Sequence, residues 1–295
     1  MLKVGLSSYS LSRAINNGEM DIFGAIRFTA EHGGKHIEIV PGSSYTVTGN
    51  DQLVADIVKA VKEAGMEISS YTIGANFLLP TAEEIRKEID RVKKEVETAA
   101  KLGVARMRHD AGWRPAPETT YEQFEKDLVI VTDACGEIAD YAKPYGITTS
   151  IENHGFHFQG SERVQRLILA VNRDNFRTTM DVGNFLCVDE DPEVATMNNI
   201  RYASMVHFKD FHIRRNPPCK DGYIPTTHGR FIRGAITGDG DVNLAGIVKI
   251  IKAANYDGFL SIEYEGWEEC KSSCERAMKR RAGPRRKQLM VRSYF

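Results

Sequence analysis

Short apolar segments alternate with amphipathic segments along most of the chain. Eight segments have the length, the β-branched content and the flanking turn residues of buried strands; they are residues 3–8, 35–40, 67–73, 105–109, 147–152, 177–181, 203–207 and 258–263. The intervening segments show helical spacing, as in 81–103, which opens with a Thr81–Glu84 capping box and closes on Gly103. Eight strand–helix units predict an α/β fold of a single domain, the (β/α)8 TIM barrel. An open doubly wound sheet is the alternative, but "GLSSYS" after the first strand lacks the glycine-rich turn common there.

Charge and cysteine usage narrow the class of protein further. Lys and Arg total 39 against 40 for Asp and Glu, so no overall field favours nucleic acid or an anionic membrane. We find no apolar run long enough for a signal peptide or a membrane span. The five cysteines are odd in number and lack CxxC spacing, which favours reduced thiols. We therefore expect a cytoplasmic protein that binds neither nucleic acid nor membrane.

Two segments interrupt the alternation. Residues 211–240 form a connection far longer than usual after the seventh strand, and such segments are typically functional lids or disordered. Residues 271–295 carry nine Lys or Arg and a single acid, Glu275. The predicted organisation is a barrel over 1–270 followed by a basic C-terminal helix or tail over 271–295. We expect this tail to be solvated or to pack between subunits of a homo-oligomer.

Polar residues stand where the last four barrel strands end. These residues are Glu152, Asp181, His207 and Glu263. Alone, such a glutamate is usually a solvated rim residue and such a histidine a structural hydrogen-bonding residue. Because the carboxyl ends of barrel strands meet at one mouth, however, the four side chains are expected to converge. Three carboxylates packed together repel one another and need a cation, so the pattern predicts a site for one divalent metal ion.

The motifs around these positions resemble the xylose isomerase-like TIM barrels, a family that includes sugar and sugar-phosphate isomerases and epimerases. The resemblance covers about residues 1–270 and is strongest in "IENH", "MDVGN", "VHFKD", "GDGDV" and "SIEYEG". It implies that Glu152, Asp181, His207 and Glu263 hold one divalent metal ion. Manganese is preferred, with magnesium, cobalt, iron or zinc as alternatives. No organic cofactor is expected.

This resemblance also implies a chemistry. A metal ion that chelates a carbonyl and its neighbouring hydroxyl acidifies the C–H bond between them and stabilises an enediolate. Glu152 and Glu263 would act as general base and general acid, giving a sugar or sugar-phosphate isomerase or epimerase. The alternative is a lyase on a keto sugar, similar to keto-inositol dehydratases or to C-glycoside deglycosidases, whose large subunit pairs with a small β-rich partner. A non-catalytic sugar-binding barrel and an apurinic endonuclease-like hydrolase are less favoured. For the hydrolase, Asn184 stands where several members have histidine.

Further polar residues near the strand ends are candidate contacts to a small carbohydrate substrate. These are His154, Asn184, Lys209, Asp210, His109, Arg214 and Arg233. Each has a structural alternative: His154 could cap its loop, Lys209 and Asp210 could pair with each other, and the arginines of the long loop could be solvated.

Overall fold

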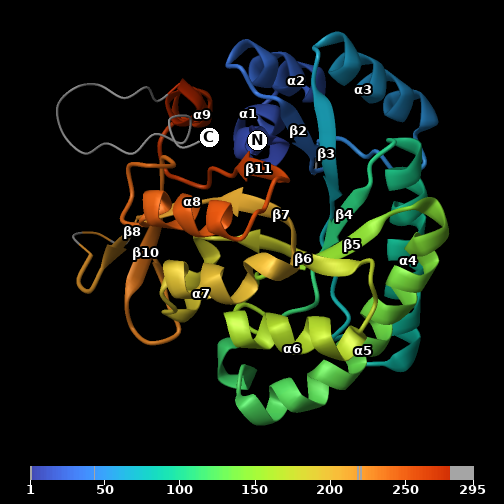
Figure 1. Cartoon of the computed structure of the whole chain (residues 1–295), viewed down its shortest axis with the longest axis vertical. Coiled ribbons are helices and arrows are strands. Elements are labelled where there is room, and N and C mark those ends of the chain that lie inside the picture. The colour runs from blue at the N-terminus through green and yellow to red at the C-terminus, as the bar shows by residue number, and fades with distance from the viewer. Residues whose placement is uncertain (1, 43, 218, 220, 280–295) are drawn as a thin grey trace.

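Eight parallel strands close on themselves in the order β1-β11-β7-β6-β5-β4-β3-β2 (Figure 1). The computed structural model describes residues 2–42, 44–217, 219 and 221–279. The barrel strands are β1 (Lys3–Ser7), β2 (His36–Ile39), β3 (Glu67–Thr72), β4 (Arg106–His109), β5 (Thr148–Glu152), β6 (Phe176–Asp181), β7 (Ala203–Phe208) and β11 (Phe259–Ile262). All eight predicted strands are confirmed, and the chain forms a (β/α)8 barrel.

Helices cover the outside of the barrel (Figure 1). They are α1 (Ser12–Asn16), α2 (Ile22–Glu31), α3 (Asp51–Glu63), α4 (Ala82–Lys101), α5 (Tyr121–Ala142), α6 (Ser161–Val171), α7 (Pro192–Asn199), α8 (Leu244–Ala253) and α9 (Cys270–Lys279). Short 3-10 helices are η1 (Ser8–Leu11), η2 (Ala116–Glu118), η3 (Lys143–Tyr145), η4 (Asn184–Val188) and η5 (Ile200–Tyr202). The predicted capping box is present: the Thr81 hydroxyl accepts from the Glu84 backbone N–H, and the Glu84 carboxylate accepts from the Thr81 backbone N–H. This pairing fixes the start of α4 by satisfying two otherwise unpaired donors.

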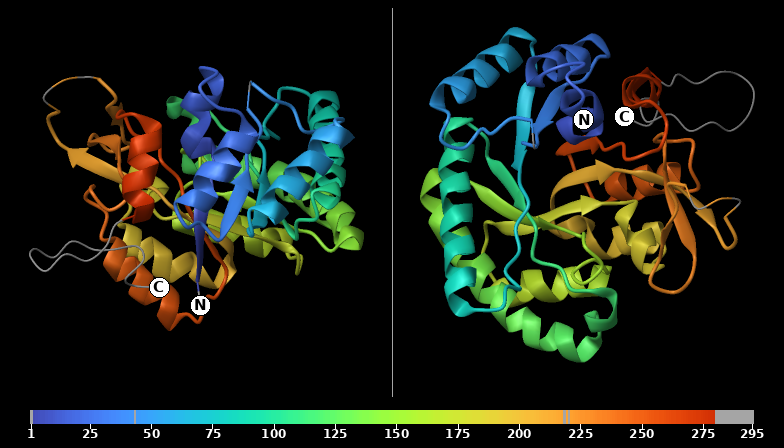
Figure 2. Two further views of the ribbon diagram at one scale, coloured as in Figure 1. Left: turned by 90° about the horizontal axis from the view of Figure 1, so that it is seen from above. Right: turned by 180° about the vertical axis from the view of Figure 1, so that it is seen from behind.

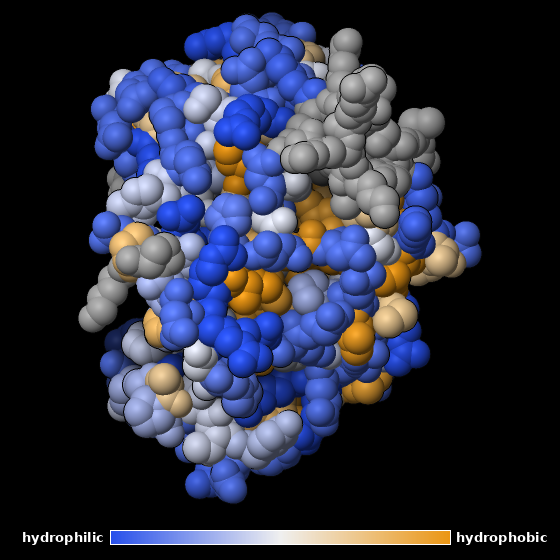
Figure 3. All heavy atoms as spheres, turned by 90° about the vertical axis from the view of Figure 1, so that its left-hand side faces the viewer, coloured by the Kyte–Doolittle hydropathy of each residue, from blue (hydrophilic) through white to orange (hydrophobic). Residues whose placement is uncertain are grey.

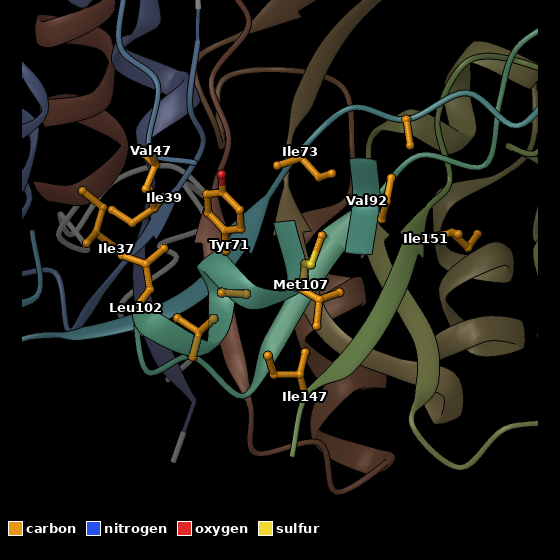
Figure 4. Packing of buried hydrophobic residues seen from close by; sticks show 14 of the residues in the cluster. Ile37, Ile39, Val47, Tyr71, Ile73, Val92, Leu102, Met107, Ile147 and Ile151 are labelled. Atoms are coloured by element: carbon orange, nitrogen blue, oxygen red, sulfur yellow. The ribbon is translucent and has the colours of Figure 1, made fainter. Parts of the chain in front are cut away.

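The core lies between the strands and the helical ring. Alternate strand residues such as Ile37, Met107 and Ile151 are fully buried, and Val92 of α4 belongs to the same cluster (Figure 4). A second cluster joins β6, β7 and β11 to the helices α7 and α8. Because strand side chains alternate between faces, packing these residues against the helices turns their neighbours toward the barrel interior. The hydrophobic pattern therefore sets which polar residues face the mouth.

The expectation of a disordered loop over 211–240 is corrected by the strands found there, whereas the alternative of a functional lid stays a prediction. Part of this segment forms a three-stranded antiparallel sheet, which we call the flap, from β8 (Asp210–Arg214), β9 (Ile224–Pro225) and β10 (Phe231–Ala235). The flap projects from the side of the barrel (Figure 2). Its β8 and β10 pair in register from Asp210 with Ala235 to Arg214 with Phe231. Antiparallel pairing satisfies the backbone groups that an irregular loop would leave unpaired.

Helix α9 crosses the expected boundary at residue 270. Its Cys270, Cys274, Ala277 and Met278 are buried in the barrel core cluster, and the helix packs beside α1 and η1. The basic tail from residue 280 onward lies outside the described residues, so its predicted role stays a prediction. Cys135, Cys187, Cys219, Cys270 and Cys274 are free thiols, as the sequence predicts.

The outer surface is mixed. On the face shown in Figure 3, most side chains are hydrophilic and the apolar ones form separate patches. Scattered apolar surface is normal for a folded chain, so this face does not itself indicate a docking partner. Among the described residues, every helix is too short or too polar to cross a membrane. The predicted homo-oligomer stays a prediction.

Candidate functional site

Four strand ends bring two glutamates, an aspartate and a histidine together inside the barrel mouth. Glu152 ends β5, Asp181 ends β6, His207 lies one residue before the end of β7, and Glu263 directly follows β11. One ligand atom from each lies within 4.8 Å of those of the other three, and all four side chains are buried. Asp181 and His207 are register partners on neighbouring strands. The predicted convergence is therefore present in the structure.

Asp181 is held by hydrogen bonds to one carboxylate oxygen, while its other oxygen lies 3.5 Å from Lys209 Nζ. Its Oδ1 accepts 2.8 Å hydrogen bonds from the backbone N–H groups of Gly183 and Asn184. The Asn153 side-chain amide makes two hydrogen bonds to the Asp181 backbone: it donates to the carbonyl and accepts from the N–H. Burial raises the pKa of the Asp181 carboxyl to about 7, against the opposing effect of Lys209. The Oδ2 atom is buried without a hydrogen-bond partner among the described residues.

His207 presents one ring nitrogen to the centre of the cluster. Its Nδ1 lies 3.7 Å from a Glu152 oxygen and 3.6 Å from a Glu263 oxygen, with no hydrogen-bond partner in the described part of the chain. Its Nε2 lies 2.9 Å from a carboxylate oxygen of Glu38. Burial opposes the charged ring, but the carboxylates of Glu38, Glu263 and Glu152 raise the pKa of His207 well above its usual value.

Two buried cations neutralise the two glutamates. Lys209 Nζ lies 2.8 Å from Glu263, 3.1 Å from Glu265 and 3.5 Å from Asp181. Burial works against ionisation of Glu263, but Lys209, followed by His207, holds the pKa of Glu263 well below its usual range.

At the other glutamate, Arg108 Nη2 lies 3.0 Å from Glu152 and 2.6 Å from Asp110. Burial again opposes ionisation, but Arg108 lowers the pKa of Glu152. Both glutamates are therefore held as carboxylates.

This donor set fits a divalent cation. Two of its atoms, Asp181 Oδ2 and His207 Nδ1, are buried, converge with the glutamates and are unsatisfied among the described residues. Buried polar atoms are rarely left unpaired unless a ligand, an ion or water completes them. Three carboxylates and one imidazole suit Mn²⁺, Mg²⁺, Co²⁺ or Fe²⁺ better than a closed structural zinc site.

A histidine–aspartate pair lies at the rim of the mouth. The His154 Nδ1 atom is 3.4 Å from Asp110 Oδ1, and the His154 side chain is 52% exposed. Hydrogen bonding to Asp110 raises the pKa of His154. Asp110 in turn contacts Arg108, which contacts Glu152, so the rim pair is joined to the buried centre through three ionic contacts. The loop-capping alternative for His154 is not what the structure shows.

The remaining predicted contacts divide into two groups. Asn184 lies in the centre, where it donates to Glu152 at 2.9 Å and accepts from Lys209 at 3.2 Å. Lys209 also lies in the centre, but it pairs with Glu263 rather than with Asp210. Asp210 accepts hydrogen bonds from the backbone N–H groups of Gly238, Gly240, Val242 and Phe211. Its role is therefore to hold the turn before α8, which corrects the expectation of a substrate contact.

His109 and the two arginines lie away from the cluster. His109 is fully buried with its ring near those of Phe77 and Phe176, and its Nδ1 lies 2.9 Å from the Asp110 carbonyl. Its neighbour Arg108 takes the inward position because strand side chains alternate. Arg214 of β8 pairs with Asp241, which lies in the turn before α8, and Arg233 stacks over Tyr223. The structure thus brings Asn184, Lys209 and His154 to the site, but not His109, Arg214 or Arg233.

Sequence reasoning missed four charged residues of the site: Glu38, Arg108, Asp110 and Glu265. The first two did carry a signal, because "KHIEIV" and "ARMRH" each place a charge inside a buried strand. Such charges are costly unless they are paired, so they mark an interior polar network. Glu265 accepts from the Tyr9 hydroxyl at 3.1 Å, and the two half-exposed side chains line the rim.

A separate hollow of about 1000 Å³ lies among the loops of the same barrel end. It is lined by residues that follow β4, β5 and β6 and by the β9 segment, including Tyr121, Phe156 and Ile224. None of the four clustered ligands lines it. The buried cluster, and not this larger space, is therefore the candidate site.

Comparisons with known proteins agree with this geometry. Residues 26–281 match the model of the xylose isomerase-like TIM barrel family. An inosose dehydratase from Clostridium perfringens is 23% identical over 231 residues, which is 76% of this chain and 77% of that protein.

Two solved structures share the fold. The probable 3-DHS dehydratase AsbF from Bacillus anthracis superposes with a TM-score of 0.73 at 17% identity, over 95% of this chain and 98% of that one. The 3-keto-D-glucoside 4-epimerase YcjR from E. coli has a TM-score of 0.70 at 17% identity, over 94% and 97%. With a family match over most of its length and a barrel that carries the cluster of candidate metal ligands, this chain belongs to the xylose isomerase-like TIM barrel family.

Proposed function

We propose that this protein is a divalent-metal-dependent lyase that removes water from a cyclic keto polyol. The site belongs to a sugar-modifying enzyme, and dehydration is the reaction that its proton-transfer groups fit best. The observation that supports this proposal most is that buried cations pair with both glutamates, Arg108 with Glu152 and Lys209 with Glu263. His154, in contrast, is half-exposed and contacts Asp110. A glutamate paired with Arg108 or Lys209 is a weak base, and the rim histidine is the free proton-transfer group.

Glu152, Asp181, His207 and Glu263 would hold the metal ion, and Arg108 and Lys209 would keep the two glutamates ionised. When bound, the ion supplies a Lewis acid that polarises the substrate carbonyl and acidifies the adjacent C–H bond. His154 takes the proton from that carbon and delivers it to the hydroxyl on the next carbon. The C–O bond breaks with its electron pair, a C=C bond forms, and water leaves. Asp110 orients the imidazole throughout and stabilises its charged form.

The similarity to an inosose dehydratase supports this choice of substrate class, because an inosose is a keto-inositol. It also reverses the order of the hypotheses drawn from the sequence, which placed isomerase or epimerase first and the keto-sugar lyase second. Epimerisation stays the second candidate, since Glu152 and Glu263 reach the centre from different strands and could serve its two faces. Epimerisation requires one glutamate to act as general base and the other as general acid. Arg108 and Lys209 oppose these roles because they lower the pKa of Glu152 and of Glu263.

The test incubates metal-loaded protein with an inosose in heavy water and follows the product by mass spectrometry. Loss of one water is expected from the wild type, whereas H154Q should lose both elimination and exchange at the carbon next to the carbonyl. H228Q is the matched control, because His228 Nδ1 also lies 3.4 Å from an aspartate, Asp189, but His228 lies between the flap strands β9 and β10 and outside the four-residue cluster. A product of unchanged formula that carries solvent deuterium would favour epimerisation. Full activity of H154Q would refute the assigned role.

A further inference from the structure

The outer nitrogen of His207 faces a carboxylate that none of the proposed ligand roles uses. His207 Nε2 lies 2.9 and 3.2 Å from the two oxygens of Glu38, and both side chains are fully buried. Glu38 belongs to β2 and His207 to β7, which are not neighbours in the barrel, so the contact crosses the interior. The Thr72 hydroxyl of β3 donates to the same carboxylate and fixes its orientation.

We propose that Glu38 is a positioning residue that sets the tautomer of His207 and thereby the affinity of the centre for its metal ion. A carboxylate can only accept hydrogen bonds, so the imidazole N–H facing Glu38 must be on Nε2. The lone pair of the neutral ring is then on Nδ1. That atom lies 3.6–3.7 Å from the Glu152 and Glu263 carboxylates and has no hydrogen-bond partner among the described residues.

The same contact orients the ring and increases its donor strength. A carboxylate behind a metal-binding imidazole holds the ring plane and makes the opposite nitrogen a better ligand. Because Thr72 restrains Glu38 from a third strand, His207 is preorganised before the ion arrives. A glutamine at position 38 has nearly the same shape, but its amide N–H can donate to Nε2. It would then favour the tautomer with the proton on Nδ1, toward the metal.

A purely structural role predicts a different result. If the pair only links β2 to β7, its loss lowers stability and leaves the affinity for metal unchanged. Glu95 offers a matched control, because it is also a buried carboxylate that accepts hydrogen bonds from hydroxyls, those of Tyr71 and Thr48. It lies on α4 and contacts none of the four proposed ligands.

The experiment titrates chelator-treated wild type, E38Q and E95Q with Mn²⁺ by calorimetry and records the Tm of each metal-free protein. E38Q is expected to bind Mn²⁺ about 10–100-fold more weakly than the wild type. E95Q is expected to match the wild type. Equal affinity in E38Q and wild type, or an equal loss in both variants, would overturn the inference. A lowered Tm of E38Q with unchanged affinity would assign Glu38 the structural role instead.

A second measurement on the wild type keeps the test independent of variant folding. In zinc-loaded protein, ¹⁵N NMR of the histidine ring should show Nε2 protonated and Nδ1 bound to the metal, and the reverse assignment would overturn the inference. The inference rests on the proposed metal site but not on the proposed reaction. Failure of the wild type to bind divalent ions would reject the site and the inference together, whereas intact binding in E38Q would reject the inference alone.

Discussion

Replacement of Lys209 by methionine tests the electrostatics of the centre through stability alone. The Lys209 side chain is 4% exposed and lies 2.8, 3.1 and 3.5 Å from Glu263, Glu265 and Asp181. Methionine keeps the length of the side chain but removes its charge, so the metal-free site would hold its carboxylates without their main cation. Because the pKa of Asp181 is already about 7, the further proton would go to Glu263, the carboxylate that Lys209 contacts most closely. For a carboxyl of ordinary pKa about 4.3, protonation at pH 7 costs about 3–4 kcal/mol.

This estimate agrees with the loss of about 3–5 kcal/mol in stability that follows when one partner of a buried ion pair is removed. At about 2–4 °C per kcal/mol, the metal-free K209M variant should melt about 10 °C below the wild type. The assay is thermal unfolding in chelator, followed by circular dichroism. The control is K3M, because Lys3 lies 2.6 Å from Glu67 in a pair whose side chains are 45% and 53% exposed. An exposed pair contributes about 0–1 kcal/mol. A K209M variant no less stable than K3M would refute the reasoning.

Three further predictions address separate parts of the molecule. E152Q should retain the far-ultraviolet circular dichroism of the wild type but lose turnover by at least about 100-fold, because it weakens a metal ligand and its contact with Arg108; wild-type turnover would contradict the ligand role. Burial lowers the pKa of His36 from 6.5 to about 4, so the unfolded chain binds the proton first, and urea unfolding should show stability falling by about 3 kcal/mol as the pH drops from 6.5 to 4. The H36Q variant should not lose this stability between pH 6.5 and 4. A pH profile of H36Q stability equal to that of the wild type would contradict the assignment of the effect to His36. D210A should lower the unfolding free energy by about 2–4 kcal/mol and expose 238–242 to proteolysis, since several backbone N–H groups lose their acceptor; D210N, which keeps one oxygen, should be less affected.

The barrel and the convergence of the four candidate ligands could be predicted from the sequence because local patterns determine both. Each strand is a short apolar run, and each ligand stands where a run ends. Once the fold is a barrel, carboxyl ends of strands must meet, so Glu152 and Glu263 are placed together without knowledge of any contact.

The partners of those ligands could not be predicted because they depend on contacts across the barrel. Glu38 is 169 residues from His207 in sequence, and only closure of the barrel brings β2 opposite β7. Arg108 and His109 are neighbours of similar polarity, and strand register alone decides that Arg108 faces the centre. A shift of one residue in that register exchanges the two faces, so a position at the strand end alone does not distinguish His109 from Arg108.

Asp210 and the flap show a different limit. The aspartate follows Lys209 and suggested a local ion pair, but its oxygens accept from backbone groups about 30 residues later. The flap strands are short, and the sequence between β8 and β9 contains Pro and Gly, so their alternation is too brief to distinguish from a loop.

Anomalous diffraction from crystals soaked with Mn²⁺ tests the central claim, that one divalent ion binds among four strand ends, most directly. The account predicts one anomalous peak per chain, within bonding distance of Glu152, Asp181, His207 and Glu263. A chain without a peak there, or with its peak elsewhere, such as in the 1000 Å³ hollow beside Tyr121, would contradict it.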